Sequence, residues 1–386
     1  PMLLIIASLL VIGLLMVYST SLDASLRMGE KPTYLFSRQV LWVLLSGAFA
    51  FGLSFIDYHF YRPFILWALI GVLILLLVVL IRNDVRFNSS RALYEGSFQP
   101  SEFAKLGIIL YLSFWLSSHR ETMNLLKDGL LPLLFMIGLT AGMIVLQPDL
   151  SAAGTVVLLG LLLFFLAGGD LKKLTIFMIF ILAAGTIVVA VSRTGQARIS
   201  DYLSGLKDLT GSSYHVKRIY EAIIKGGTFG VGIGEADTKF TGLPLPHTDS
   251  IFAVIVEETG FFGALGVMIL YVLLLWRGMV IAKRAPDQLG SLISFGLTSW
   301  IALEACLNFS VSVGLFPFAG NALPLISYGG SSMIASMTAL GIVMNVARRS
   351  VMKETAERSQ TSATVDLRRR DWRRSVSGAD RYGEVE

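Results

Sequence analysis

The sequence predicts an all-α integral membrane protein with about ten transmembrane helices and one long extracellular loop between helices 7 and 8. Of its 386 residues, 54% are hydrophobic and only 15% are charged, whereas soluble domains carry about 25% charged residues. The mean hydropathy of +0.69 points to the same class. A water-soluble fold could not bury this much apolar surface. Apolar runs long enough to cross a bilayer also recur along the whole chain, since one span needs about 20 mainly apolar residues.

The predicted spans follow one another with short polar connections. They cover residues 2–18, 40–56, 64–81, 103–116, 130–146, 150–167, 174–192, 251–281, 289–315 and 322–347. We interpret Pro1 as a trimmed start and residues 2–18 as a span rather than a signal peptide, because no charged segment precedes them. Between the fifth and sixth spans, Pro148 cannot continue a helix and Asp149 is a suitable N-cap for the next one. The single cysteine, Cys306, excludes an internal disulfide.

These spans divide the chain into four parts. Residues 1–192 hold helices 1–7, residues 193–250 the long extracytoplasmic loop, residues 251–347 helices 8–10, and residues 348–386 a basic cytoplasmic tail. Ten Lys and Arg residues lie from Arg348 onward, so the net charge of +5 requires no nucleic acid partner. We expect the tail to be disordered and close to anionic membrane lipids.

The distribution of basic residues predicts the orientation. With the N-terminus inside, the inner short loops and the proximal tail hold twelve Lys and Arg residues and the outer short loops hold six. The positive-inside rule therefore places both termini in the cytoplasm of a bacterial inner membrane and residues 193–250 outside. The seven basic residues of the long segment do not change this, because long loops cross the membrane largely regardless of charge.

Two charged residues begin the predicted fourth span. Ser101 is a candidate N-cap, and Glu102 in the first turn suits the positive end of the helix. Glu102 and Lys105 are three residues apart, so they share a helix face and can pair. This pattern fits a capped helix with a structural ion pair and equally fits a polar cavity in the membrane.

The end of the long segment carries the strongest candidate for chemistry. Pro244 and Pro246 stiffen the approach to His247 and Asp249, and an apolar helix begins at Ile251. Asp249 occupies a position suited to an N-cap, which is its simplest interpretation. A carboxylate at the outer membrane edge is also well placed to deprotonate a hydroxyl group.

The long segment also contains a glycine-rich stretch and a group of basic residues. The glycines of residues 226–234 do not form a dinucleotide fingerprint, since Glu235 replaces the third glycine and no βαβ unit surrounds them. They predict either a flexible loop or a close approach to a phosphate. The basic residues would attract an anionic lipid headgroup or simply form a solvated surface; they include Lys217, Arg218, Lys225 and Lys239.

Two further polar features lie in the last spans. Glu304 lies near the middle of the ninth span, where ionisable groups are costly and usually functional. The alternatives are that Glu304 is protonated or that it bonds to Asn308, one helical turn further on. The small residues of 325–332, which include Ser327, favour either close helix packing or the lining of a cavity.

Five of these segments, in order, resemble the SEDS family, the membrane peptidoglycan glycosyltransferases that include FtsW, RodA and their sporulation relative. The matching segments are FQPSEFAK at 98–105, QPDL at 147–150, LP through HTDSIFA at 243–253, the glutamates of 257–258 before Gly260, and LPLISYGGSS at 323–332. The likeness covers about residues 1 to 350, and the last segment leans towards the FtsW branch.

The resemblance implies an enzyme that polymerises the lipid-linked disaccharide-pentapeptide, lipid II, on the outer face of the cytoplasmic membrane during cell division or elongation. It assigns catalysis to Asp249, a cavity pair to Glu102 and Lys105, and a loop arginine to Arg91. It also implies a class B penicillin-binding protein, a transpeptidase, as partner. The sequence departs from the family at Glu304 and Arg218, where glutamine is usual, and at Leu245, where an acidic residue is usual.

The chemistry follows from the substrate. Asp249 would act as general base, and the departing pyrophosphate would be neutralised by some of the basic residues Arg91, Lys105, Lys217, Arg218 and Lys239. His247 and Ser327 are further candidates for substrate binding. No cofactor is certain and no metal ligands are predicted, although a divalent cation such as Mg²⁺ or Mn²⁺ would assist the neutralisation. The alternatives are a lipid II flippase and a non-catalytic scaffold for cell-wall enzymes.

Overall fold

The computed structural model describes residues 1–82, 99–208 and 211–379, and the regular secondary structure in these ranges is all helical. The elements are α1 (Met2–Arg27), α2 (Tyr34–Leu53), η1 (Tyr58–Tyr61), α3 (Ile65–Arg82), α4 (Pro100–Ser118), η2 (Leu126–Leu130), α5 (Leu131–Val145), α6 (Leu150–Leu166), α7 (Leu171–Val191), α8 (Arg193–Lys207), α9 (Tyr214–Gly226), α10 (Ile251–Lys283), α11 (Gln288–Ser312) and α12 (Gly330–Ala379). Each predicted span overlaps one of the helices α1 to α7 and α10 to α12, so the all-α prediction is confirmed.

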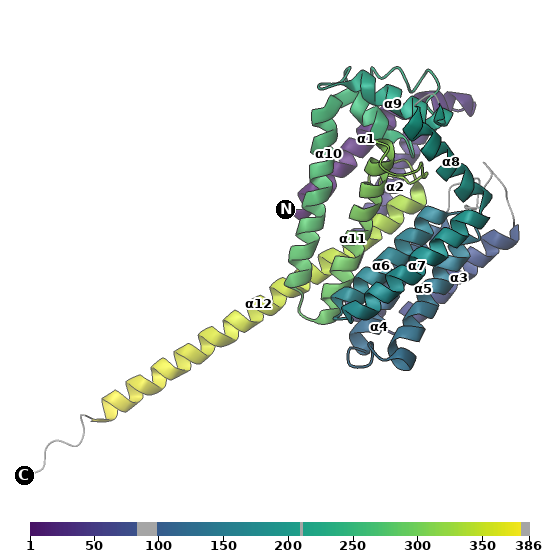
Figure 1. Cartoon of the computed structure of the whole chain (residues 1–386). Helices are drawn as coiled ribbons and strands as arrows, with labels where there is room; N and C mark the ends of the chain where they lie inside the picture. The colour runs from purple at the N-terminus through teal and green to yellow at the C-terminus, as the bar shows by residue number, and fades with distance from the viewer. Residues whose placement is uncertain (83–98, 209–210, 380–386) are drawn as a thin grey trace, which may run out of the picture.

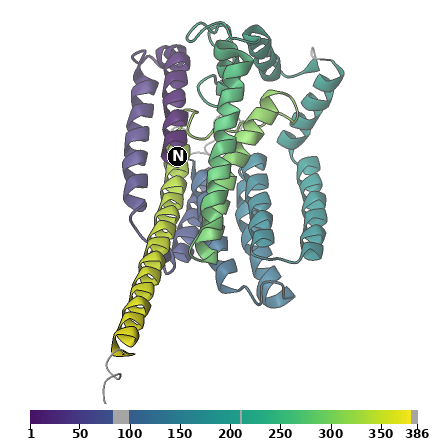
Figure 2. The same ribbon diagram turned by 90° about the vertical axis from the view of Figure 1, so that its left-hand side faces the viewer.

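Seven of the described helices are long and apolar enough to cross a membrane: α1, α2, α5 with η2, α7, α10, α11 and the first part of α12. The apolar parts of α3 and α6 are shorter. Helix α4 is not among these helices, and its first turns contain the charged residues Glu102 and Lys105. The chain is therefore a multi-pass membrane protein, and the count of ten spans stays a prediction. Helix α7 has no buried residue and lies at the edge of the bundle (Figure 2), as expected of a helix that faces lipid.

Helix α11 forms the centre of the bundle, where it packs against α4, α6, α10 and α12. Its small residues allow this close packing: a Cβ atom at Gly296 would lie 2.8 Å from Ile109 of α4. Helices α8 and α9 lie across one end of the bundle, and α12 extends beyond the other end (Figure 1). Helix α10 begins at the end covered by α9 (Figure 1).

Three of the predicted segments differ from the structure in their helical content. The segment 193–250 is not one long loop, because it contains α8 and α9; the buried face of α9 is formed by Ile219, Ala222 and Gly226 and packs on α10. The last span begins at Gly330 rather than at residue 322, since Pro324 and the positive φ of Leu325 keep the preceding residues out of a helix. The tail is not disordered up to Ala379: α12 continues to that residue, and the sequence after Arg348 has no proline and no glycine before Gly378.

Two of the capping predictions, for Asp149 and Ser101, have different outcomes. Asp149 is the N-cap of α6, and its carboxylate accepts a hydrogen bond from the backbone N–H of Ala152 at 3.3 Å. Ser101 is not the N-cap of α4. Gln99 occupies that position, and Pro100 is the first helical residue, where its missing N–H and fixed φ are favourable.

Candidate active site

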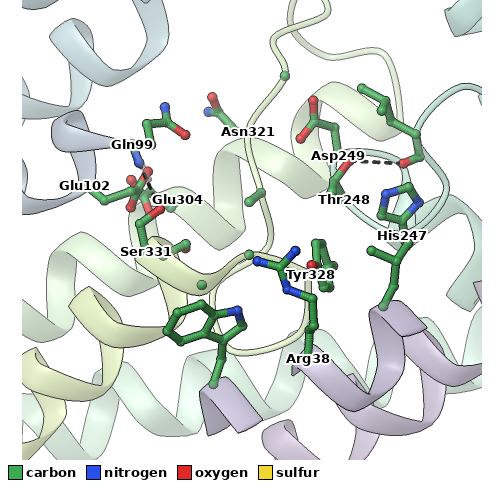
Figure 3. Close-up of a pocket in the computed structure, with 18 of the residues that line it drawn as sticks. Arg38, Gln99, Glu102, His247, Thr248, Asp249, Glu304, Asn321, Tyr328 and Ser331 are labelled. Carbon is green, nitrogen blue, oxygen red and sulfur yellow. Dashed lines mark hydrogen bonds between the residues drawn. The ribbon is translucent and has the colours of Figure 1, made fainter. Parts of the chain in front are cut away.

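A polar cavity of about 680 Å³ lies between α2, α4, α6, α11, the start of α12 and the two loops that precede α10 and α12. Its volume is in the range of small-molecule sites in proteins. On one side lie Glu102, Lys105 and Glu304, here called the ion cluster. On the other side lie His247, Thr248 and Asp249, here called the Asp249 turn (Figure 3). The cavity therefore brings together residues that are far apart in the sequence.

The Asp249 turn reverses the chain just before α10. The backbone N–H groups of Thr248 and Ser250 both donate to the carbonyl of Leu245, at 3.2 and 3.3 Å. Leu245 has a φ of 48°, which a tight turn between two prolines imposes. The N-cap position of α10 is Ser250 rather than Asp249. Asp249 precedes the helix, and it lines the cavity (Figure 3).

Three successive carbonyls of the Asp249 turn are held by neighbouring elements. The N–H of Tyr328 donates to the carbonyl of His247 at 2.9 Å. The hydroxyl of Ser327 donates to that of Thr248 at 2.7 Å. The side-chain amide of Asn308 on α11 donates to that of Asp249 at 3.2 Å. Buried hydrogen bonds of this kind fix a turn in one conformation.

His247 is an uncharged member of the site. Burial lowers the pKa of His247 to about 4, so the imidazole is neutral near pH 7. Its Nδ1 atom is buried without a hydrogen-bond partner, and its ring meets that of Tyr328 edge-on, 5.8 Å between centroids. His247 can therefore contribute a hydrogen bond to a ligand but no positive charge.

The ion cluster confirms that Glu102 and Lys105 pair, with 2.7 Å between the ammonium and the carboxylate. Glu304 of α11 makes a second ion pair with Lys105. The suggested bond between Glu304 and Asn308 is wrong, because the amide nitrogen of Asn308 donates to two backbone carbonyls instead. All three charged side chains are buried, and the second oxygen of Glu102 has no hydrogen-bond partner. The cluster thus carries two carboxylates around one cation next to the cavity.

The structure does not bring all the predicted residues into the cavity. Lys239 is buried elsewhere and donates to Ser19 at 2.8 Å and to Glu258 at 2.7 Å. Arg218 bonds Glu221 and the backbone of Thr241. Lys217 is exposed on α9, and Ser327 lies behind the wall, where its hydroxyl holds the Asp249 turn. Arg91 lies outside the described residues. Of the predicted site residues, Asp249, His247, Glu102 and Lys105 line the cavity.

The glycine-rich stretch has a structural role that neither prediction anticipated. The N–H groups of Val231 and Gly232 donate to the carbonyls of Glu257 and Glu258, at 2.9 and 3.1 Å. A Cβ atom at Gly230 would lie 2.3 Å from the carbonyl oxygen of Glu258. The stretch is thus a docking turn against α10, at the point where Gly260, with a φ of 69°, interrupts that helix. The close approach that its glycines permit is made to the backbone of α10.

Several cavity residues were missed from the sequence. Arg38 and Trp42 come from α2, and Asn321 comes from the loop before α12 (Figure 3). Tyr328 and Ser331 also line the cavity, which agrees with the cavity-lining alternative predicted for residues 325–332. Arg38 donates to the hydroxyl of Tyr34 at 3.1 Å and brings a guanidinium into the cavity wall. Tyr34 and Arg38 are one helical turn apart, so the sequence indicates that they are neighbours on one helix face, but it does not show what that face contacts.

No group of three or more His, Cys, Asp or Glu side chains is arranged to hold a metal ion in the part of the chain that the structure describes. The divalent cation stays a prediction from the chemistry.

The fold and the cavity define a polytopic membrane protein with a charged, partly enclosed site at one end of its helix bundle. The chain belongs to the FtsW, RodA and SpoVE family, described as cell cycle proteins, whose sequence profile matches residues 1–352.

Similar proteins agree with this family. The chain is 35% identical to stage V sporulation protein E of Bacillus subtilis over 347 residues, covering 89% of this chain and 94% of that protein. It is 34% identical to a probable peptidoglycan glycosyltransferase FtsW of Trichlorobacter lovleyi over 356 residues, covering 89% and 92%. Among solved structures, a chain of a peptidoglycan synthase complex that coordinates polymerization and crosslinking matches with a TM-score of 0.74 at 26% identity, covering 90% of this chain and 97% of that one. The rod shape determining protein RodA of Thermus thermophilus matches with a TM-score of 0.66 at 25% identity, covering 90% and 95%.

Proposed function

We propose that this chain is a peptidoglycan glycosyltransferase that polymerises lipid II into glycan strands, with Asp249 as the general base. The observation that carries the proposal is the position of the Asp249 carboxylate in the wall of a cavity whose other side holds the ion cluster. The names of its relatives give the reaction class: several are probable peptidoglycan glycosyltransferases.

The residues of the cavity account for the reaction as follows. The acceptor sugar hydroxyl gives its proton to Asp249 as its oxygen bonds to the anomeric carbon of the donor. The bond from that carbon to the lipid pyrophosphate breaks, and its electron pair leaves with the pyrophosphate. Arg38, in the same cavity wall, is placed to bind a phosphate with its guanidinium fork. Lys105 is held between Glu102 and Glu304, an arrangement better suited to orienting polar substrate groups.

We also propose an orientation in the membrane. The substrate of this reaction is presented on the outer face, so the Asp249 turn, α8 and α9 lie outside and both termini lie in the cytoplasm. The partner in our proposal is a class B penicillin-binding protein, which would crosslink the product; the structural relative from a peptidoglycan synthase complex supports such an assembly.

Two other functions make different predictions. A lipid II flippase would move labelled lipid II between leaflets without needing the Asp249 carboxylate. A non-catalytic scaffold would bind cell-wall enzymes and polymerise nothing. Purified protein given labelled lipid II, with and without the partner, distinguishes both from a polymerase.

The substitution Asp249→Asn tests the proposal. Asparagine has nearly the same size and leaves the three backbone hydrogen bonds of the turn in place, but it cannot accept the proton. Polymerisation by the purified protein should fall by roughly 10²–10⁴-fold, the usual contribution of a general base. Asp237→Asn, which removes the same charge from an exposed residue of the same segment, is the control and should keep the full rate. A near wild-type rate for Asp249→Asn would show that another group removes the proton.

A further inference from the structure

The loop before α12 comes into close contact with the Asp249 side chain. A Cβ atom at Gly320 would lie 2.6 Å from the carboxylate oxygen Oδ2 of Asp249 and 3.5 Å from its Cγ. Separations below about 3 Å are not found for real Cβ atoms. The φ of Gly320 is not in the left-handed region, so its backbone conformation does not demand glycine. A side chain at this position would instead require the Asp249 carboxylate to move.

A second contact fixes the distance between the same two segments. The side-chain amide of Asn308 donates to the carbonyl of Asp249 at 3.2 Å and to that of Asn321, the residue after Gly320. The distance of this second bond is 2.6 Å. Asn308 is 3% exposed and belongs to α11, the central helix of the bundle. One rigid amide group thus ties Asp249 and the Gly320 segment to a common support.

We propose that Gly320 and Asn308 are positioning residues for Asp249. The backbone at Gly320 is the surface against which the Asp249 carboxylate rests, and Asn308 holds that surface and the turn at a fixed separation. The direction in which the carboxylate faces the cavity is then set by the loop before α12 and not by the turn alone. This inference rests on the proposed role of Asp249 as general base.

The expected sensitivity is large because proton removal depends on alignment. A methyl group at Gly320 has to displace the carboxylate, since the other side of the contact is the backbone itself. A misplacement of about 1 Å of a catalytic group reduces rates by roughly 10²-fold. Substrate binding, which uses the rest of the cavity, should change little.

The test compares Gly320→Ala with Gly154→Ala in the purified full-length protein, using labelled lipid II. Gly154 belongs to α6 but does not line the cavity, and a Cβ atom there would meet nothing within 4 Å. Gly320→Ala should lower kcat by roughly 10²-fold and leave KM within about threefold. Gly154→Ala should keep both constants, and neither variant should lower the thermal unfolding midpoint.

A double-mutant comparison shows whether the effect passes through Asp249. In an Asp249→Asn background, Gly320→Ala should not reduce the residual rate further, because the carboxylate it displaces is already absent. Asn308→Ala should show the same pattern with a smaller loss of kcat. A wild-type kcat for Gly320→Ala, or equal losses in both backgrounds, would overturn the inference. These results differ from failure of the proposed function, in which Asp249→Asn itself would remain active.

Discussion

At the scale of single residues, the ion cluster is the feature that departs most from the sequence-based view. The sequence predicted that Lys105 can pair with Glu102, and the structure shows that Glu304, 199 residues further along the chain, binds the same ammonium. Exchanging Glu102 and Lys105 would therefore not preserve a simple pair. It would place a carboxylate at position 105 opposite Glu304, two like charges in a buried site.

The cluster predicts an order of stabilities. Glu304→Gln keeps an acceptor oxygen for Lys105 and removes one of the two carboxylate charges, so it should change the free energy of unfolding by less than about 1 kcal/mol. Lys105→Met leaves two buried carboxylates without their cation and should be destabilising by roughly 3–5 kcal/mol. Thermal unfolding in detergent measures the order. A Lys105→Met protein as stable as Glu304→Gln would mean that the cluster is not an ionic unit.

The same residues show what a sequence can reveal. The Glu102–Lys105 pair was predictable because three residues on one helix are always neighbours. The ion pair between Lys105 and Glu304 depends on how α4 and α11 pack. The position of Arg38 in the same cavity as Asp249 depends on how α2 packs. No local pattern encodes those distances. Lys239 was misjudged for the same reason: its charge suggested a ligand, but its partner is Glu258 inside the protein.

At the scale of elements, α9 and its glycine-rich turn act as a support for the outer part of α10. Apolar runs identified the membrane helices from the sequence, since about 20 apolar residues have few other uses. The pattern of α9 is shorter and amphipathic, with Ile219 and Ile223 on one face and charges on the other, so it was hidden in a polar segment. Its turn brings the backbone of residues 226–232 against the interruption at Gly260.

Two alanine substitutions at helical glycines test this support. A Cβ atom at Gly226, the last residue of α9, would lie 2.1 Å from the carbonyl oxygen of Val256, whereas one at Gly266 of α10 would meet nothing within 4 Å. Both changes gain up to roughly 1 kcal/mol of helix propensity. Gly266→Ala should therefore keep or raise the thermal midpoint, and Gly226→Ala should lower it and make the turn sensitive to proteolysis. Equal behaviour of the two variants would contradict a docked turn.

At the scale of the whole molecule, the two ends of the bundle have different roles. The end with α8, α9 and the Asp249 turn holds the site, and the other end is the one from which α12 extends (Figure 1). The count of basic residues in the short loops, twelve against six, predicts that the α12 end is cytoplasmic. The helices confirm the multi-pass fold, but they do not show which end of the bundle faces the cytoplasm.

Two cysteine variants measure the orientation. Cys306 is replaced by alanine, and a cysteine is placed either at Thr228, exposed in the glycine-rich turn, or at Thr355, exposed on the extension of α12. A membrane-impermeant maleimide added to spheroplasts should label the Thr228→Cys protein and leave the Thr355→Cys protein unlabelled until the membrane is lysed. The reverse pattern would place the site in the cytoplasm and contradict the proposed reaction on the outer face.

The position of the last cavity residues in the chain has a consequence for biosynthesis. The cavity needs α2 and α4 from the first part of the chain, but also Tyr328 and Ser331 from near its end. Tyr328 donates to His247, and Ser331 accepts a hydrogen bond from the backbone N–H of Gln99 at 3.3 Å. Because a chain folds from its N-terminus as it emerges from the ribosome, the nascent protein has every carboxylate of the cavity before it has the residues that complete the cavity wall. We therefore expect activity to begin only after α12 has been synthesised and packed, and a chain that stops before α12 to be inactive.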